Sequence, residues 1–243
     1  MNYTLPKITK DSVELYAYTN RSVLKGKPKG IVLDFHGLGG GNLRNDPNDF
    51  DLLCAENGIL TVFPYYGPWS WMNADAVKYV DEIIDAVCGR EGVSSNEIPI
   101  ISTGGSMGGL SALIYTKYAK ITPKACFVNC PVCDLMYHAT ERVDLPRTIY
   151  LAFNYGEKSL EDAMMANSPY HLAETMPNVP YYIIHGTADR LVNIDINSVR
   201  FVENMKKYGK DVTFITVNGM EHCDIGSYPD VKEKYFNAII NSI

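Results

Sequence analysis

A serine in a glycine-rich turn is the first residue of this sequence that could do covalent chemistry. Ser106 stands in TGGSMGG, residues 103–109, which contains the pattern G-x-S-x-G. This turn separates an apolar run, 98–102, from a stretch of helical periodicity, 110–120. A serine at a sharp strand-to-helix turn requires small neighbours, and it presents its hydroxyl at the positive end of the helix dipole. We therefore expect Ser106 to be a nucleophile, with a phosphate-binding or packing turn as the alternative.

An acid and a base follow the serine along the chain. A serine hydroxyl is a poor nucleophile until a base takes its proton, and an acid must hold that base in the right tautomer. Asp189 follows the apolar run 179–184, and His222 follows the run 211–217. Side chains just beyond the ends of parallel strands meet at one edge of a sheet. Because one fold class uses the order nucleophile, acid, base, we expect Ser106, Asp189 and His222 to form a catalytic triad.

A second glycine-rich segment, HGLGGG at 36–41, could stabilise the charge that acyl transfer builds. Negative charge develops on the substrate oxygen, and each backbone N–H aimed at it contributes about 2.7 to 4 kcal/mol. Glycines allow the close approach of the backbone that this requires. We expect the N–H groups of Leu38 and Met107 to form an oxyanion hole, with Gly39 as the substitute for Leu38.

The other histidines and acids are weaker candidates for the triad. His185 precedes a glycine at a strand end, so we expect it to shape the turn before Asp189 rather than to act as a base. His36 follows another apolar run, and we expect it to brace the loop after it. Asp134, after the run 125–132, is the second candidate for the acid. The remaining candidates, for surface, substrate-facing or acid roles, are His138, His171, Asp195 and Asp224.

Aromatic residues are concentrated in the segment YYGPWSW, residues 65–71, which also follows an apolar run. Rings beside a cleft suit the flat faces of sugars or a phenolic acyl group. We expect Trp69 and Trp71 to contact the substrate, with Gly39 in the same site. The alternative is that these rings pack beneath a lid.

The elements that must position these residues alternate along the chain. Apolar runs typical of buried strands alternate with helical stretches, of which 73–89 is the clearest. This pattern predicts an α/β fold with a mainly parallel sheet covered by helices on both faces. From 134 to 177 no strong strand is present, and we expect a small lid insertion there, placed after the sixth strand. The expected strands are 13–18, 30–35, 59–65, 98–102, 125–132, 179–184 and 211–217, and the other helices are 110–120, 194–208 and 231–240.

The composition is that of a globular protein. Of 243 residues, 46% are hydrophobic and 21% charged, which allows a sizeable core and excludes a disordered, collagen-like or coiled-coil chain. The net charge of −6 argues against nucleic acid as a partner. No run approaches the roughly 18 to 20 apolar residues of a membrane helix, so we expect no membrane partner. The N-terminus has no apolar stretch of signal-peptide length, and we expect one cytoplasmic domain over 1–243.

Six cysteines are spread along the chain. A chain of this length does not need disulfides, and several of the cysteines lie in apolar runs, so we expect free structural thiols. Cys130 and Cys133 have the C-x-x-C spacing of a redox pair or of half a zinc site, but no second close pair exists. We therefore expect no metal site and no cofactor. The other cysteines are Cys54, Cys88, Cys126 and Cys223.

With these motifs the chain resembles the α/β-hydrolase superfamily over nearly its whole length. The segments at 36–40, 104–109, 185–192 and 219–222 look like those of compact bacterial esterases related to the prolyl-oligopeptidase catalytic domain. That group includes acetyl, acetylxylan and cinnamoyl (feruloyl) esterases. Prolyl oligopeptidases themselves carry an N-terminal propeller, and with few residues before the first expected strand we expect no propeller here. The resemblance therefore implies an esterase more than a peptidase.

These observations predict a serine carboxylic ester hydrolase whose partner is a small-molecule ester. We expect short acyl or aryl esters as substrates, in particular acetyl or feruloyl groups on plant-derived oligosaccharides. An exopeptidase on short peptides is the alternative, and Glu157, Glu161 or Asp162 could anchor the amino terminus of such a peptide. A non-catalytic binding module on the same scaffold is a third possibility, against which the presence of all three triad residues argues.

Overall fold

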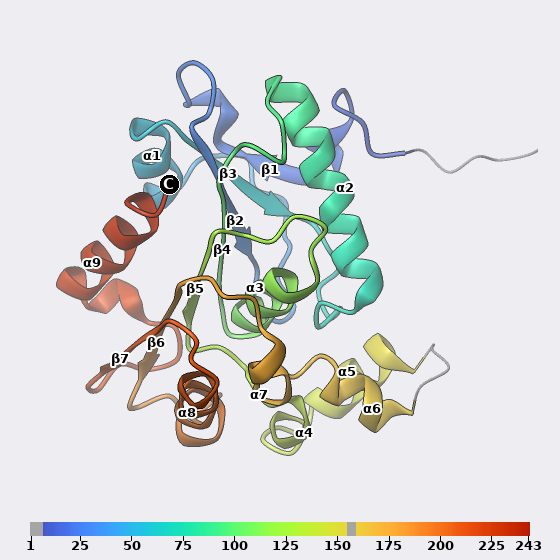
Figure 1. Ribbon diagram of the computed structural model, residues 1–243, viewed down its shortest axis with the longest axis vertical. Helices are drawn as coiled ribbons and strands as arrows, with labels where there is room; N and C mark the ends of the chain where they lie inside the picture. Colours follow the sequence, from blue (N-terminus) through green and yellow to red (C-terminus); the bar gives the residue numbers. More distant parts are fainter. Residues whose placement is uncertain (1–6, 155–158) are drawn as a thin grey trace, which may run out of the picture.

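Seven strands form one sheet in the computed structural model, which describes residues 7–154 and 159–243 (Figure 1). The strands are β1 (Ala17–Thr19), β2 (Gly30–Phe35), β3 (Ile59–Pro64), β4 (Ile100–Gly105), β5 (Ala125–Asn129), β6 (Tyr181–Gly186) and β7 (Val212–Val217). Their spatial order is β1-β3-β2-β4-β5-β6-β7. Only β1 runs antiparallel to its neighbour, and every other described pair is parallel. The prediction of a mainly parallel sheet is confirmed.

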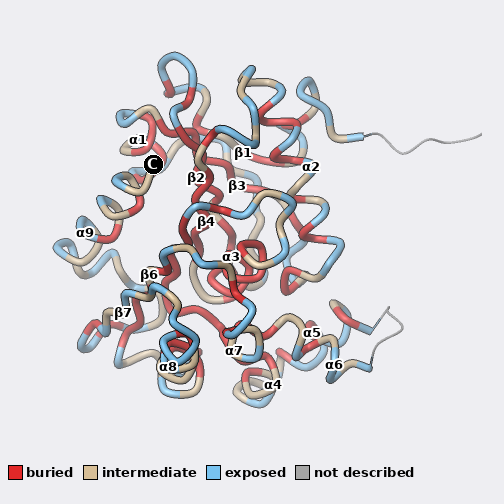
Figure 2. Tube along the Cα trace, viewed as in Figure 1, coloured by how far each residue is buried: buried red, intermediate tan, exposed pale blue. Residues whose placement is uncertain are grey.

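Helices cover both faces of this sheet. Side chains alternate along β2, so that Ile31 and Leu33 join one cluster of buried residues and Val32 joins another. The central strands are buried along almost their whole length (Figure 2), which is why they read as continuous apolar runs. The first cluster is covered by α2 (Ala74–Glu91), α3 (Met107–Tyr118) and α8 (Arg200–Lys207), the second by α1 (Asp49–Glu56) and α9 (Pro229–Ile240).

Most expected elements form, with three local differences. The first half of the expected strand 13–18 is a 3-10 turn, and the expected helix 194–208 begins as a π turn before α8. Helix α1 was not expected, although Asn48 and Asp51 form a capping box at its start. No helix in the described ranges is long and apolar enough to span a bilayer. The short turns are η1 (Val13–Leu15), η2 (Asn20–Ser22), η4 (Asp195–Val199) and η5 (Ile225–Ser227).

The expected insertion is helical and lies at the same end of the sheet as α8 (Figure 1). It follows β5, the fifth strand, and not the sixth as predicted; the strands expected before residue 134 also number five, so the position was miscounted. Residues 155–158, which include Glu157, lie outside the described residues. The insertion contains α4 (Leu135–His138), α5 (Leu145–Phe153), α6 (Leu160–Met165), α7 (Pro169–Leu172) and η3 (Ala173–Thr175).

Candidate active site

Ser106 lies at the turn from β4 to α3, and its backbone is strained. Its φ of 60° is in the left-handed region, which residues with a side chain rarely adopt. The neighbouring glycines make the turn possible: a Cβ on Gly104 would lie 2.4 Å from the carbonyl oxygen of Gly108. A Cβ on Gly108 would lie 2.1 Å from the carbonyl oxygen of Phe35. The close packing of backbone on backbone fixes the serine at the carboxyl edge of the sheet.

The loop after β2 offers one backbone donor beside this turn, and α3 offers another. Met107 opens α3, so its N–H has no partner within the helix. Leu38 lines the same cleft as Ser106, and its N–H donates to no atom of the described chain. The prediction that Gly39 could substitute for Leu38 as a donor is wrong, because the N–H of Gly39 donates to the carbonyl of Pro68 at 2.9 Å. Gly39 is also not among the residues that line the cleft.

His36 supports this loop from its buried side. The ring lies 4.1 Å from that of Tyr66, stacked on it, and the Tyr66 hydroxyl donates to the carbonyl of His36 at 2.9 Å. The Nδ1–H of His36 donates to the carbonyl of Gly37 at 2.9 Å. Burial lowers the pKa of His36, which favours the neutral ring. These contacts fit the predicted bracing role.

Asp189 lies in the loop after β6, and its carboxylate is fully buried with four hydrogen bonds. One oxygen accepts from the N–H groups of Leu191 at 2.8 Å and Val192 at 3.0 Å. The other accepts from His222 Nδ1 at 2.7 Å and from His185 Nε2 at 3.1 Å. Burial raises the pKa of Asp189, but these hydrogen bonds outweigh burial and hold the pKa well below its usual range. The Asp189 carboxylate is therefore permanently ionised beside His222.

His222 follows β7 and is oriented by this carboxylate. Since its Nδ1–H donates to Asp189, the network assigns the free lone pair to Nε2. His222 and Ser106 line one cleft of about 700 Å³. No hydrogen bond joins their side chains in the described structure; Nε2 instead lies 3.8 Å from the sulfur of Cys223. Such contacts between nucleophile and base often tighten only when substrate binds.

The loops that carry the acid and the base are locked to each other. A Cβ on Gly186 would lie 2.0 Å from the carbonyl oxygen of Met220, so only glycine fits at the end of β6. The N–H of Ala188 donates to that same carbonyl at 3.1 Å, and the N–H of Thr187 donates to the carbonyl of Val217 at 3.0 Å. Backbone contacts thus set the distance between Asp189 and its histidine.

The weaker acid and base candidates lie elsewhere. Asp134 caps α4 by accepting from the N–H of Tyr137 at 3.1 Å, and the side chains of Arg200 and His171 lie 3.8 and 3.9 Å from its carboxylate. His185 is fully buried between Asp189 and Ser198, whose hydroxyl lies 2.7 Å from Nδ1. This is the supporting position that the sequence predicted for His185. His138 is buried against Glu141, and Asp195 and Asp224 are exposed.

The two tryptophans occupy different environments. Trp71 has no exposed surface, and its indole N–H donates to the hydroxyl of Thr148 in α5 at 3.1 Å. The prediction that Trp71 contacts substrate is therefore wrong, because its left-handed backbone, with a φ of 48°, turns the ring beneath the insertion. Trp69 is 48% exposed and lies next to Gly39, outside the residues that line the cleft.

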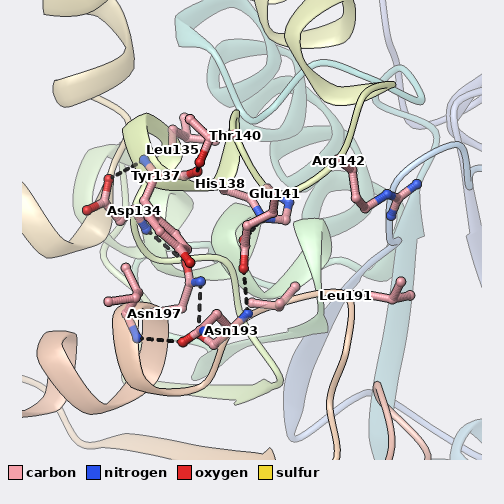
Figure 3. Close-up of polar contacts among 12 residues, drawn as sticks. Asp134, Leu135, Tyr137, His138, Thr140, Glu141, Arg142, Leu191, Asn193 and Asn197 are labelled. Carbon is pink, nitrogen blue, oxygen red and sulfur yellow. Dashed lines mark hydrogen bonds and ion pairs between the residues drawn. The ribbon is translucent and has the colours of Figure 1, made fainter.

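Two residues at the cleft mouth were missed by the sequence analysis. Arg142 of the insertion and Leu191 of the acid loop both line the cleft and extend to the same side in Figure 3. The segments that carry them are joined by Glu141, whose carboxylate accepts from the N–H of Asn193 at 2.8 Å. Asn197 joins them again by accepting from the N–H groups at 133 and 134. No spacing in the sequence marks these contacts, since each depends on one side chain meeting a distant backbone.

An ion pair was also missed at the side of the cleft. Arg44 donates to Asp34 at 3.0 Å, and its guanidinium lies 3.6 Å from the ring centre of Phe63. Burial raises the pKa of Asp34, and the adjacent guanidinium opposes that shift. The position of Asp34 near the end of β2 was a usable signal, because that edge of the sheet carries the other site residues.

The strand order and the turn that carries Ser106 are those of the α/β-hydrolase fold. Residues 75–241 match the model of the prolyl oligopeptidase family. The chain therefore belongs to the prolyl oligopeptidase family. No curated protein matches it.

Solved structures with this fold include peptidases and an esterase. An acylaminoacyl peptidase of Pyrococcus horikoshii has a TM-score of 0.72 at 17% identity, covering 89% of this chain and 37% of that one. A puromycin-hydrolyzing peptidase of Mycobacterium tuberculosis has a TM-score of 0.65 at 22% identity, and the match covers 82% of this chain and 31% of that one. The esterase Est2 of Thermogutta terrifontis, bound to propionate, has a TM-score of 0.61 at 23% identity, and the match covers 93% of this chain and 88% of that one. The chain thus spans about a third of the length of both peptidases.

Proposed function

We propose that this protein is a serine carboxylic ester hydrolase acting on short acyl or aryl esters. The observation that carries the proposal is the strained Ser106 in one cleft with His222, whose ring is held by the buried anion Asp189. Serine, histidine and aspartate in these roles perform acyl transfer through a covalent acyl-enzyme. Metal ions or cofactors are not required for that chemistry.

Each residue has a step in the proposed reaction. The oxygen of Ser106 attacks the ester carbonyl as its proton passes to Nε2 of His222. The N–H groups of Leu38 and Met107 donate to the oxyanion that forms. His222 then protonates the leaving alcohol, and a water molecule, activated by the same nitrogen, hydrolyses the acyl-enzyme. Asp189 stays ionised throughout and stabilises the charge that His222 carries.

The charges of the cleft favour an ester over a peptide with a free amino terminus. An exopeptidase needs an unpaired carboxylate near the nucleophile to bind the ammonium group. Among the described residues that line the cleft, Asp34 is the one carboxylate, and Arg44 already pairs with it. Glu161 and Asp162, two of the expected anchors, lie on α6 and do not line the cleft. The third, Glu157, lies outside the described residues.

The acyl and alcohol groups are proposed from the cleft lining. Leu38, Leu191 and the ring of Phe63 give apolar surface near Ser106, which suits an acetyl or a feruloyl group. Arg142 donates from Nε and Nη2 to Asp144, and its remaining N–H groups are the donors at the mouth to which the hydroxyls of a sugar could bind. We therefore propose acetyl or feruloyl esters of plant-derived oligosaccharides as the substrate class.

Initial rates on a panel of substrates test this proposal. The panel contains p-nitrophenyl acetate, butyrate and octanoate, methyl ferulate, acetylated xylo-oligosaccharide and an Ala-Pro anilide, with Ser106→Ala as the matched control. We expect hydrolysis of acetate or ferulate and none of the anilide. Cleavage of the anilide alone would make the protein a peptidase. A fluorophosphonate that fails to label Ser106 would refute the enzyme altogether.

A further inference from the structure

Two cysteines that are distant in sequence lie beside the catalytic histidine. Cys130 follows β5 and is fully buried, and Cys223 directly follows His222. The N–H of Cys223 donates to the sulfur of Cys130 at 3.4 Å. The sulfur of Cys223 lies 3.8 Å from Nε2 of His222. Cys133, the partner suggested by the C-x-x-C spacing, instead directs its thiol to the carbonyl of Pro131 at 3.8 Å.

The backbone directs both thiols to this position. Cys130 has a φ of 45° and Cys223 a φ of 56°, both in the left-handed region. A residue with a side chain is strained there. Gly105 leaves room for the second thiol, since a Cβ on it would lie 3.0 Å from the sulfur of Cys223. Two strained cysteines that converge on one histidine are a feature that the acyl-transfer mechanism does not use.

We propose that Cys130, Cys223 and His222 form a binding site for a thiophilic divalent cation such as Zn²⁺. The two sulfurs and one ring nitrogen of His222 all lie within 4.8 Å of one another. Tetrahedral zinc, with Zn–S of about 2.3 Å and Zn–N of about 2.0 Å, requires a sulfur–nitrogen separation of about 3.6 Å. The observed 3.8 Å between Cys223 and His222 fits that separation. The cysteines and the histidine can thus bind the cation after small shifts.

The surroundings of His222 match those of a metal-binding histidine. Such a histidine donates its second ring N–H to a carboxylate, which fixes the tautomer and raises the basicity of the ligand nitrogen. His222 donates Nδ1–H to Asp189 at 2.7 Å, which leaves Nε2 free. The sulfur of Cys130 also lies within 4.8 Å of atoms of His185 and Asp189, but those two residues are hydrogen-bonded to each other. The cation is therefore assigned to the side of Nε2, where the fourth position opens on the cleft.

Binding would inhibit hydrolysis reversibly. The cation takes three ligands, both thiols release their protons to solvent, and no group changes its oxidation state. With its lone pair on the metal, Nε2 cannot accept the proton of Ser106. The inhibition rests on the proposed function, whereas the binding does not. Zinc here is an inhibitor, distinct from any catalytic cofactor.

Cadmium binding tests the site without reference to activity. The reduced full-length chain, freed of metal, is titrated with Cd²⁺ and the thiolate-to-cadmium charge-transfer absorption is recorded. We expect saturation at one Cd²⁺ per chain, in Ser106→Ala as in the native protein, and a weaker band for Cys223→Ser. Cys88→Ala removes a buried thiol of α2 and should leave the band unchanged. An unchanged band in Cys223→Ser, or no band in the native chain, would overturn the site.

Zinc inhibition of p-nitrophenyl acetate hydrolysis tests the consequence. Each variant is measured relative to its own zinc-free rate, and chelator should restore the activity. Loss of a ligand should raise the half-inhibitory Zn²⁺ concentration at least about tenfold in Cys223→Ser and in Cys130→Ser, and not in Cys88→Ala. Cys223 is the primary test because it is partly exposed, and a melting curve shows whether the buried Cys130 variant folds. Equal inhibition of all variants would refute the proposed role of these thiols.

Discussion

The loops at the catalytic edge and the helical insertion beside them are held together in different ways. At the edge, backbone packs directly on backbone, as where Gly186 meets the carbonyl of Met220. In the insertion, single side chains make the connections, as where Glu141 accepts from the N–H of Asn193. A backbone contact excludes every residue but glycine, whereas a side-chain contact allows many residues. The comparison shows why the edge can be recognised in a sequence and the mouth of the cleft cannot.

The largest effect on activity should come from replacing Ser106, the proposed nucleophile. Ser106→Ala removes the group that forms the acyl-enzyme, and we expect kcat to fall by about 10⁶-fold, or roughly 8 kcal/mol. The alanine retains the shape of the turn, so the thermal midpoint should change little. Initial rates on p-nitrophenyl acetate and a melting curve measure both. If more than about a tenth of the activity remained, Ser106 would not be the nucleophile.

Substitution of two aspartates, one at the catalytic edge and one in the insertion, compares the effect of the two regions on kcat. Asp189→Asn keeps the size of the side chain but removes the anion that orients His222, and we expect a loss of about 10⁴-fold in kcat. Asp134→Asn changes the cap of α4, where asparagine caps equally well, and we expect a loss of less than about tenfold. Both rates are measured at one pH. The reverse order would assign the acid to Asp134.

The two tryptophans should differ in how much each contributes to the stability of the fold. Trp71→Ala deletes a fully buried ring under the insertion and should lower the free energy of unfolding by about 3 to 5 kcal/mol. Trp69→Ala changes an exposed ring, and we expect a stability effect within about 0.5 kcal/mol. Chemical denaturation measures the two. Equal losses of stability would mean that Trp69 is packed as Trp71 is.

The smallest effect should come from the contact that joins the insertion to the acid loop. Glu141→Ala removes the acceptor of the Asn193 N–H, so that Arg142 and Leu191 lose their fixed positions at the mouth. We expect KM to rise by about fivefold at unchanged kcat, since the triad is untouched. Glu161→Ala, on α6, is the matched control. A fall in kcat instead would show that the insertion positions the catalytic residues.

The sequence analysis succeeded where residue type was dictated by the backbone. The glycines of the serine turn were visible because few other residues fit there. Asp189 and His222 were visible because each follows a strand end, and the structure joins them at 2.7 Å. It failed for Trp71, since an aromatic run does not show which ring faces the core. It also failed for Gly39, because composition does not reveal that Pro68 accepts its N–H. The approach of Cys130 to Cys223, residues from two different strand ends, depends on the order of the strands in space.

The contact between Gly186 and Met220 has a practical consequence for changing this protein in the laboratory. Because the loops after β6 and β7 share that contact, a change in the length of one loop alone should also displace the other. Residues outside both loops, such as Arg142 and Trp69, are better positions to vary. A search for substrates should therefore vary these two residues and leave both loops as they are.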